Sequence, residues 1–328
     1  MNYNFTNKNI LITGGGGFVG GELARQILKL GAKEVRVVDR KVPSDWYQIH
    51  EGANNLNLDL ADYSNCKKVT KNIDAIFNLA ADMGGMGFIE NNKALCMLSV
   101  QVNTNLLKSA LESGNIERYF FSSSACVYRS DLQDTEKVIP LKEADAYPAS
   151  PEDGYGWEKL FSERMCRHFN EDFGLETRIA RFHNVYGPFG TYAGGREKAP
   201  AALCRKVIEA KNSGKYEIDI WGDGNQTRSF MYIDDCVEGI LRITNSDINF
   251  PINLGSSFLV SINHLIDIIE EIAGIKVKRN YDLSAPLGVR GRNSDNTLIK
   301  QELGWEPTIS LEQGLEKTYI WIHDQLNQ

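Results

Sequence analysis

The chain of 328 residues has few of the features that mark membrane, secreted or metal-binding proteins. No run approaches the roughly 20 consecutive apolar residues that a membrane span needs, and residues 1–9 lack the apolar core of a signal peptide. Six cysteines are scattered without a CxxC pair, and five histidines without an HExxH motif. We therefore expect a soluble, cytoplasmic protein with reduced thiols and no metal site.

Basic residues are also fewer than acidic residues. Lysine and arginine number 36 against 43 acidic residues, which leaves a net charge of −7 and argues against a nucleic-acid partner. The apolar share of 42% and the charged share of 24% are typical of a globular protein. The length suits two lobes that share a cleft.

Short β-rich runs alternate with helical patterns in the first half of the chain. The expected strands are residues 8–13, 34–39, 73–79 and 118–122, and the expected helices are near 20–30, 94–113 and 156–172. Such alternation predicts an α/β fold, a Rossmann-type doubly wound parallel sheet. Gly31 is expected to end the first helix.

Beyond residue 180 the sequence becomes rich in glycine, proline and asparagine, with shorter helices expected at 200–210 and 260–273. We expect a dinucleotide-binding domain over 1–180, onto which about 232–250 packs back. A smaller C-terminal substrate-binding lobe would then comprise 181–231 and 251–328.

A glycine-rich turn follows the first expected strand. Residues 13–20 read T-G-G-G-G-F-V-G, so Gly14, Gly17 and Gly20 form a G-x-x-G-x-x-G pattern that encloses Phe18 and Val19. Glycines here let the backbone approach a pyrophosphate at the start of a helix. A flexible glycine turn is the alternative, which the flanking strand and amphipathic helix make weaker.

An acidic residue then ends the second expected strand. Asp39 lies 19 residues after Gly20, where a carboxylate would bind ribose hydroxyls and repel a 2′-phosphate, which favours NAD over NADP. Arg40 beside it is the opposing signal, because arginine can accommodate that phosphate. Asp59 and Ala80 lie where this fold contacts adenine and pyrophosphate, although either is equally compatible with a turn or a packing position.

A Y-x-x-x-K motif places Tyr155 and Lys159 on one face of an expected helix. A nearby ammonium favours the phenolate, which can take a hydroxyl proton while NAD takes a hydride. Ser124, at a strand end 31 residues earlier, is the expected third hydroxyl partner. An ordinary amphipathic helix is the alternative interpretation of the motif.

Together with the glycine turn, Ser124, Tyr155 and Lys159 resemble the extended short-chain dehydrogenases/reductases that act on nucleotide sugars. Members that eliminate water carry T-D-E-V-Y-G around the hydroxyl partner, whereas this chain reads S-S-S-A-C-V-Y over 122–128. The carboxyl pair for elimination is absent, and the thiol of Cys126 stands two residues beyond Ser124. Once C4 of a hexose is a ketone, the C3 and C5 protons become acidic, and a thiol with a reference pKa of about 8.5 suits their removal.

Inversion at carbon needs a proton donor on the opposite face, and residues 194–200 (GGREKAP) offer Lys198 with Glu197 beside it. A solvated loop lysine is the alternative for Lys198, and a buried structural cysteine is the alternative for Cys126.

Longer segments are similar to the GDP-mannose 3,5-epimerase family. They are residues 81–89 (ADMGGMGFI), 123–126 (SSAC), 181–190 (RFHNVYGPFG), 194–202 (GGREKAPAA), 221–230 (WGDGNQTRSF) and 288–296 (GVRGRNSDN). The resemblance implies that Cys126 and Lys198 are the acid/base pair and that Tyr155 with Lys159 oxidises C4. It also implies contacts with the GDP-sugar from Gly84, Ser124, Asn184, Glu197, Lys198, Lys206, Gln226, Arg290 and Arg292.

The implied reaction converts GDP-mannose to GDP-L-galactose with tightly bound NAD and no net redox. The alternatives are a GDP-4-keto-6-deoxymannose epimerase-reductase, which also carries a thiol here but consumes NADPH, another nucleotide-sugar epimerase, and a non-catalytic NAD-sensing protein. By analogy with this fold, helices near 94–113 and 156–172 are expected to pair across a homodimer.

Overall fold

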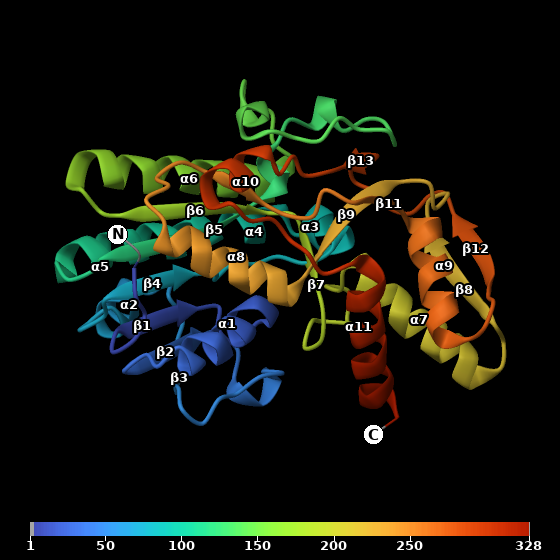
Figure 1. Ribbon diagram of the computed structural model, residues 1–328, viewed down its shortest axis with the longest axis horizontal. Coiled ribbons are helices and arrows are strands. Elements are labelled where there is room, and N and C mark those ends of the chain that lie inside the picture. The colour runs from blue at the N-terminus through green and yellow to red at the C-terminus, as the bar shows by residue number, and fades with distance from the viewer. Residues whose placement is uncertain (1–2, 328) are drawn as a thin grey trace.

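The structure, a computed structural model, describes residues 3–327 and is built around a seven-stranded parallel sheet (Figure 1). The strand order is β10-β6-β5-β4-β1-β2-β3. The strands are β1 (Asn9–Thr13), β2 (Glu34–Asp39), β3 (Asn54–Asn57), β4 (Ala75–Asn78), β5 (Arg118–Ser124), β6 (Thr177–Phe182) and β10 (Ile252–Leu254). The chain runs from β1 outward to β3 and then returns to β4, so the strand order reverses between β1 and β4. In such sheets ligands bind beyond the carboxyl ends of the strands at this point.

Helices cover both faces of the sheet, and the strands nearest its centre, β1 and β4, are almost wholly buried. Alternate residues of β1 point to opposite faces, so that Ile10 and Ile12 join one buried cluster and Leu11 joins another. The first cluster includes side chains of α1 (Phe18–Lys29) and α8 (Ile233–Asn245). The second includes side chains of α2 (Tyr63–Val69), α5 (Ser99–Ser113) and α6 (Asp153–Phe173). The predicted doubly wound α/β fold is confirmed.

The second half of the chain adds smaller sheets beyond the carboxyl end of the main one. Strand β9 (Thr227–Tyr232) pairs with β7 (Asn184–Tyr186), β11 (Leu259–Ser261) and β13 (Gly291–Arg292), and β8 (Glu217–Trp221) pairs with β12 (Lys278–Asp282). Figure 1 shows β8, β12, α7 (Ala199–Ser213) and α9 (Ile262–Ala273) at the end of the molecule far from α5. The remaining elements are α3 (Met86–Asn91), α4 (Lys93–Met97), α10 (Thr297–Leu303), α11 (Leu311–Leu326) and the 3-10 turns η1 (Pro43–Asp45), η2 (Ala125–Val127), η3 (Ser130–Leu132) and η4 (Glu143–Ala146).

Helix α8 contacts β5, β6 and α1, as expected for the segment near 232–250. Strand β10 lies just beyond that segment and pairs with β6, so the main sheet also takes residues 252–254. The division into two domains at the stated boundaries stays a prediction. Within residues 3–327, no helix is both long and apolar enough to cross a membrane.

Two predicted helices differ in their limits. The helix expected over 94–113 is two helices, α4 and α5, which meet at Leu98. The helix expected from Val260 begins instead at Ile262, because the hydroxyl of Ser261 accepts a hydrogen bond from the His264 N–H and caps the first turn. Val260 lies in β11. Helix α1 ends as predicted, with Gly31 at φ +78° just beyond it.

Candidate active site

Two cavities meet at the carboxyl end of the main sheet. The larger, the sheet-end cavity of about 850 Å³, is lined by residues that end or follow β1, β2, β4, β5 and β6. The smaller, the distal cavity of about 400 Å³, lies among α3, η2, α7, β8, β9 and β13. Ser124, Tyr155 and Lys198 line both cavities, so the two are neighbours at these side chains.

The sheet-end cavity contains every residue predicted for the cofactor. They are Gly14, Gly17, Phe18, Val19, Gly20, Asp39, Asp59, Ala80, Tyr155 and Lys159. Gly14 has φ +69°, and a Cβ there would lie 2.8 Å from the carbonyl carbon of Leu79. A Cβ on Gly20 would lie 2.5 Å from the carbonyl oxygen of Gly14. Both glycines are therefore required by the turn as it stands, and the N-terminus of α1 is left open to a phosphate group.

Asp39 is held in the cavity by the turn that it faces. Its carboxylate accepts hydrogen bonds from the N–H groups of Gly16, at 3.1 Å, and of Lys41, at 2.9 Å. The neighbouring cations are engaged elsewhere, because Arg40 pairs with the buried Asp82 and Lys41 donates to the Gly16 carbonyl at 2.8 Å. Because Arg40 and Lys41 are already paired, Asp39 offers an uncompensated carboxylate, which suits the hydroxyl groups of an unphosphorylated ribose better than a 2′-phosphate.

Tyr155 and Lys159 lie one turn apart on α6, at the junction of the cavities. The ammonium nitrogen of Lys159 is 5.6 Å from the centroid of the Tyr155 ring and 3.6 Å from the carboxylate of Glu158. Ser124 ends β5, and its hydroxyl accepts a hydrogen bond from the Cys126 N–H at 3.2 Å. The structure thus brings together the three predicted residues of the oxidation step.

Burial raises the pKa of the Tyr155 phenol well above its ordinary value, and Cys126 and Glu158 add to the rise. The hydrogen bond with Ser124 lowers this pKa. Burial therefore outweighs any lowering of the phenol pKa by the Lys159 ammonium.

Cys126 lies in η2, immediately after β5, and is 8% exposed where it lines the distal cavity. Burial raises the pKa of its thiol, and Glu152 raises it further, whereas Arg292 and Ser124 lower it. The guanidinium of Arg292 donates to Sγ of Cys126 at 3.5 Å. The thiol is thus directed at the cavity and contacted by a fixed cation.

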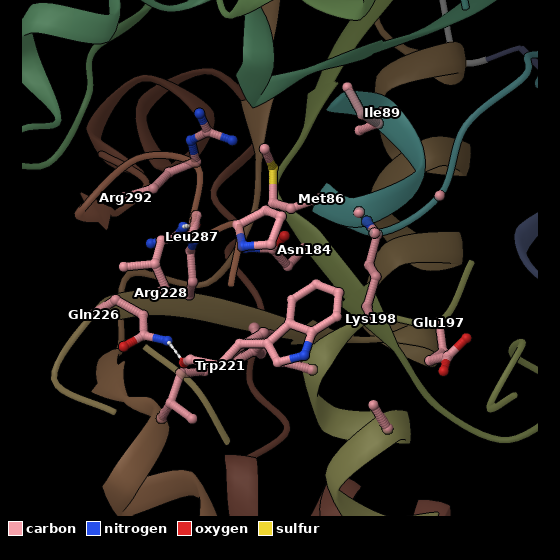
Figure 2. Close-up of a pocket in the computed structure, with 18 of the residues that line it drawn as sticks. Met86, Ile89, Asn184, Glu197, Lys198, Trp221, Gln226, Arg228, Leu287 and Arg292 are labelled. Carbon is pink, nitrogen blue, oxygen red and sulfur yellow. Dashed lines mark hydrogen bonds between the residues drawn. The ribbon is translucent and has the colours of Figure 1, made fainter. Parts of the chain in front are cut away.

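Lys198 precedes the first turn of α7 and lines both cavities. Burial lowers the pKa of its ammonium, and Arg292 lowers it further, while Cys126 and Cys236 oppose that change. Lys198 is thus no solvated surface lysine, and its amine is made easier to deprotonate. Figure 2 places Lys198 and Arg292 on opposite sides of the pocket, with Met86 between them in this view.

Most of the other residues predicted for the substrate also line the distal cavity. They are Gly84, Ser124, Asn184, Glu197, Lys206, Gln226 and Arg292. Arg290 does not. Its guanidinium pairs with Asp223 and Glu136, so its charge is already neutralised. Its predicted contact with a diphosphate would require these ion pairs to open, and this role stays a prediction.

Three lining residues escaped the sequence analysis. The side chain of Arg228 is half-buried and donates to the carbonyl oxygens of Thr227, Leu287 and Val289. Trp221 and Met86 form apolar walls (Figure 2). All three lie in segments that carried the family resemblance, and Arg228 has no further signal in the sequence around it.

Among residues 3–327, no three His, Cys, Asp or Glu side chains are grouped so as to hold a metal ion. The six cysteines are free and buried.

Comparisons with known proteins agree with this geometry. The sequence pattern of the NAD dependent epimerase/dehydratase family matches residues 10–255. A rice protein (Oryza sativa subsp. indica) called GDP-mannose 3,5-epimerase 1 is 46% identical over 326 residues, which cover 97% of this chain and 82% of the relative. The GDP-mannose 3,5-epimerase of Arabidopsis thaliana is 45% identical over 329 residues, covering 98% and 84%.

Solved structures share the fold over nearly the whole length. The UDP-glucose 4-epimerase of Thermotoga maritima superposes with a TM-score of 0.87 at 26% identity, covering 97% of this chain and 99% of that chain. The UDP-glucuronic acid 4-epimerase of Bacillus cereus, solved with UDP-glucuronic acid and NAD, gives a TM-score of 0.80 at 26% identity with the same coverage.

Proposed function

Because the chain belongs to the NAD dependent epimerase/dehydratase family, we propose that it epimerises GDP-mannose at C3 and C5 to give GDP-L-galactose. The observation that carries this proposal is the shared lining of the distal cavity. Cys126 and Lys198 line it together with Ser124 and Tyr155, so two proton-exchanging groups and an oxidising tyrosine face one space. A dehydrogenase without epimerisation has no use for the additional thiol and amine.

The enzyme is NAD-dependent, and the sheet-end cavity fits that cofactor. The glycine turn leaves room where any Cβ would collide with Leu79 or Gly14, and Asp39 offers a carboxylate to a ribose. When bound, NAD would supply a hydride acceptor for C4 and a positively charged ring, and a reaction without net redox would not consume it.

The chain's own residues then divide the proton transfers. Tyr155, fixed by Ser124, takes the proton of the C4 hydroxyl and later returns it. With a ketone at C4, the protons at C3 and C5 become acidic. Cys126 and Lys198 remove and replace them on opposite faces of the ring, which inverts each carbon. Burial lowers the pKa of Lys198, which favours a role for its amine as a base.

The diphosphate and sugar are held by the remaining predicted residues. Lys206 is partly buried beside the cavity and donates to the Asp219 carbonyl at 2.6 Å, which orients its ammonium. Arg228, with a pKa lowered to about 10 by burial, adds a second cation. Asn184 and Gln226 provide amide groups suited to sugar hydroxyls. These roles are part of the proposal.

Incubation with GDP-mannose, followed by proton NMR of the products, tests the function. We expect GDP-L-galactose, with a C5-only product where C3 inversion fails, and no net change in reduced nicotinamide. The Tyr155→Phe variant is the control. Unchanged GDP-mannose at high enzyme concentration would contradict the proposal. Stoichiometric consumption of NADPH with a 4-keto-6-deoxy substrate would instead establish the epimerase-reductase alternative.

The homodimer expected from the sequence has support on one surface. Helices α4 and α6 contact each other and expose Met97, Leu98, Trp157 and Phe161, each at least 47% exposed. Such a patch is what two copies would bury. Sedimentation velocity should give a dimer for the native chain and a monomer for Phe161→Glu. A native monomer at micromolar concentration would refute the dimer.

We also propose a cytoplasmic location, which the six free thiols support, because thiols stay reduced in that compartment.

A further inference from the structure

A buried carboxylate stands behind the thiol of Cys126 and belongs to no role assigned so far. Glu152 lies just before α6 and does not line either cavity. Its N–H donates to the Cys126 carbonyl oxygen at 2.9 Å, which fixes the two backbones together. A Cβ on Gly156, in the next turn, would lie 2.3 Å from the same carbonyl oxygen. Glu152 is thus held against the thiol by the backbone itself.

Arg292 connects this carboxylate to the sulfur. Its guanidinium donates to Glu152 Oε2 at 2.6 Å, to Gln133 Oε1 at 2.6 Å and to Cys126 Sγ at 3.5 Å. The residue is 6% exposed, and the side chain of Glu152 is 12% exposed. Three separate partners fix the guanidinium plane, so that its position relative to Sγ is determined by Glu152 and Gln133 rather than by solvent.

The second carboxylate oxygen has no such partner. Glu152 Oε1 is buried and accepts no hydrogen bond of regular geometry from any of residues 3–327, and the thiol of Cys126 is close enough to the carboxylate to interact with it. A buried, uncompensated carboxylate oxygen is costly, which argues that it is retained for a purpose. Its negative charge opposes the effect of Arg292 on the thiol, because a carboxylate disfavours a neighbouring thiolate whereas a guanidinium favours it.

We propose that Glu152 is a positioning residue that sets the pH at which Cys126 loses its proton, by holding Arg292 on the sulfur and partly cancelling its charge. The role in catalysis rests on the proposed epimerisation, whereas the effect on the thiol does not. The titratable or charged groups that face the sulfur from the surrounding elements are Tyr155, Glu152, Lys198, Arg228 and Arg292. Of these, Glu152 is the carboxylate.

The test is the pKa of the Cys126 thiol, measured from the pH dependence of iodoacetamide alkylation without substrate. Cys126 is the cysteine that retains surface, since the other five are 0% exposed, and a Cys126→Ala variant gives the background labelling. We expect Glu152→Gln to lower the thiol pKa by about one unit, because the glutamine amide oxygen can still accept the hydrogen bond of Arg292 while the cancelling negative charge is gone. Glu136→Gln is the matched control, since it removes a carboxylate from Arg290 two residues away along the chain.

A pKa in Glu152→Gln equal to or above that of the native protein overturns the proposal, whether or not GDP-mannose is turned over. Should that variant not fold, the native thiol still decides, because a native pKa below about 8.5 contradicts a carboxylate that opposes ionisation. With active enzyme, the thiol-dependent limb of the kcat profile should move by the same amount while KM changes less than about twofold. A purely structural role would leave that limb in place.

Discussion

The two cavities are built in different ways, and the difference explains how each depends on the sequence. The sheet-end cavity is formed mainly by residues at and just after the carboxyl ends of neighbouring parallel strands, and every residue predicted for it lies there. The distal cavity is formed by side chains from α7, β8, β9 and β13, which are separated by long stretches of chain. The shape of the sheet-end cavity is therefore determined mainly by short local segments, whereas the distal cavity forms only when segments far apart in the sequence pack together.

This contrast predicts different consequences of mutation. A change in the sheet-end cavity acts through steric fit to the backbone and should alter cofactor binding. A change in the distal cavity acts through charge and proton position and should alter chemistry while leaving the cofactor bound. The residues at the junction should show the largest effects, because they serve both.

Tyr155→Phe is expected to have the largest effect. Loss of the phenolic proton acceptor removes general acid–base catalysis at C4, so kcat should fall by about 10³-fold. Bound NAD should remain near one per chain, because the glycine turn and Asp39 are untouched. Turnover by NMR and NAD content after denaturation measure the two effects. A loss of activity below about tenfold would remove Tyr155 from the oxidation step.

Cys126→Ala should come next. The variant should bind NAD and GDP-mannose but lose exchange of sugar C–H protons with deuterated water by at least about 100-fold. Cys96→Ala is the matched control, since Cys96 belongs to the same buried cluster as Cys126 and Tyr155 but does not line the distal cavity. Undiminished deuterium incorporation in Cys126→Ala would show that the thiol takes no part.

The same contrast explains what the sequence could and could not predict. Strand β2 was predicted with its observed limits, and with it the place of Asp39, because alternating apolar and polar residues favour a strand locally. Cys126 was singled out by its spacing after Ser124, and its acid/base role came from the family resemblance. Each of these signals lies within a few residues of the feature that it specifies.

Glu152 gave no comparable signal. It reads as an ordinary acidic residue before a helix, and its partner Arg292 lies 140 positions away. Arg290 shows the converse. The motif that contains Arg290 was recognised from the sequence. Its ion pairs with Asp223 and Glu136 were not, because the three residues lie in segments far apart in the sequence that meet only in the folded chain. Lys198 was recognised only through the family resemblance, because its burial is a property of the assembled cavity.

Gly14→Ala tests the sheet-end cavity. The new Cβ would meet the Leu79 backbone at 2.8 Å at a positive φ, so we expect NAD affinity to fall at least about tenfold. Gly114→Ala has the same kind of backbone strain, with φ +67°, but no atom within 4 Å of the Cβ. It should lose about 1–2 kcal/mol of stability and keep its NAD affinity. Equal NAD affinities in the two variants would show that strain, and not steric fit, governs the site.

A pH-dependent effect on stability is expected from His183, which lies between β6 and β7 and so joins the main sheet to the distal elements. It is 1% exposed, and burial lowers its pKa to about 3. The unfolded chain binds a proton near pH 6.5, whereas the folded chain does not. Between these values the unfolded state carries the extra proton, so stability must fall as the pH falls, by about 1.4 kcal/mol per unit. Above pH 6.5 the imidazole contributes no slope.

His183→Gln keeps an amide donor for the Oδ1 of Asn253, which lies 3.2 Å from Nε2 of the imidazole, but cannot bind the proton. Urea unfolding at saturating NAD, from pH 6 to pH 4.5, should therefore show a shallower loss of stability in the variant by about 1.4 kcal/mol per unit. His264→Gln, at an exposed position, controls for removal of one imidazole. Parallel slopes for the native chain and His183→Gln would mean that the imidazole of His183 takes up its proton as readily in the folded as in the unfolded chain.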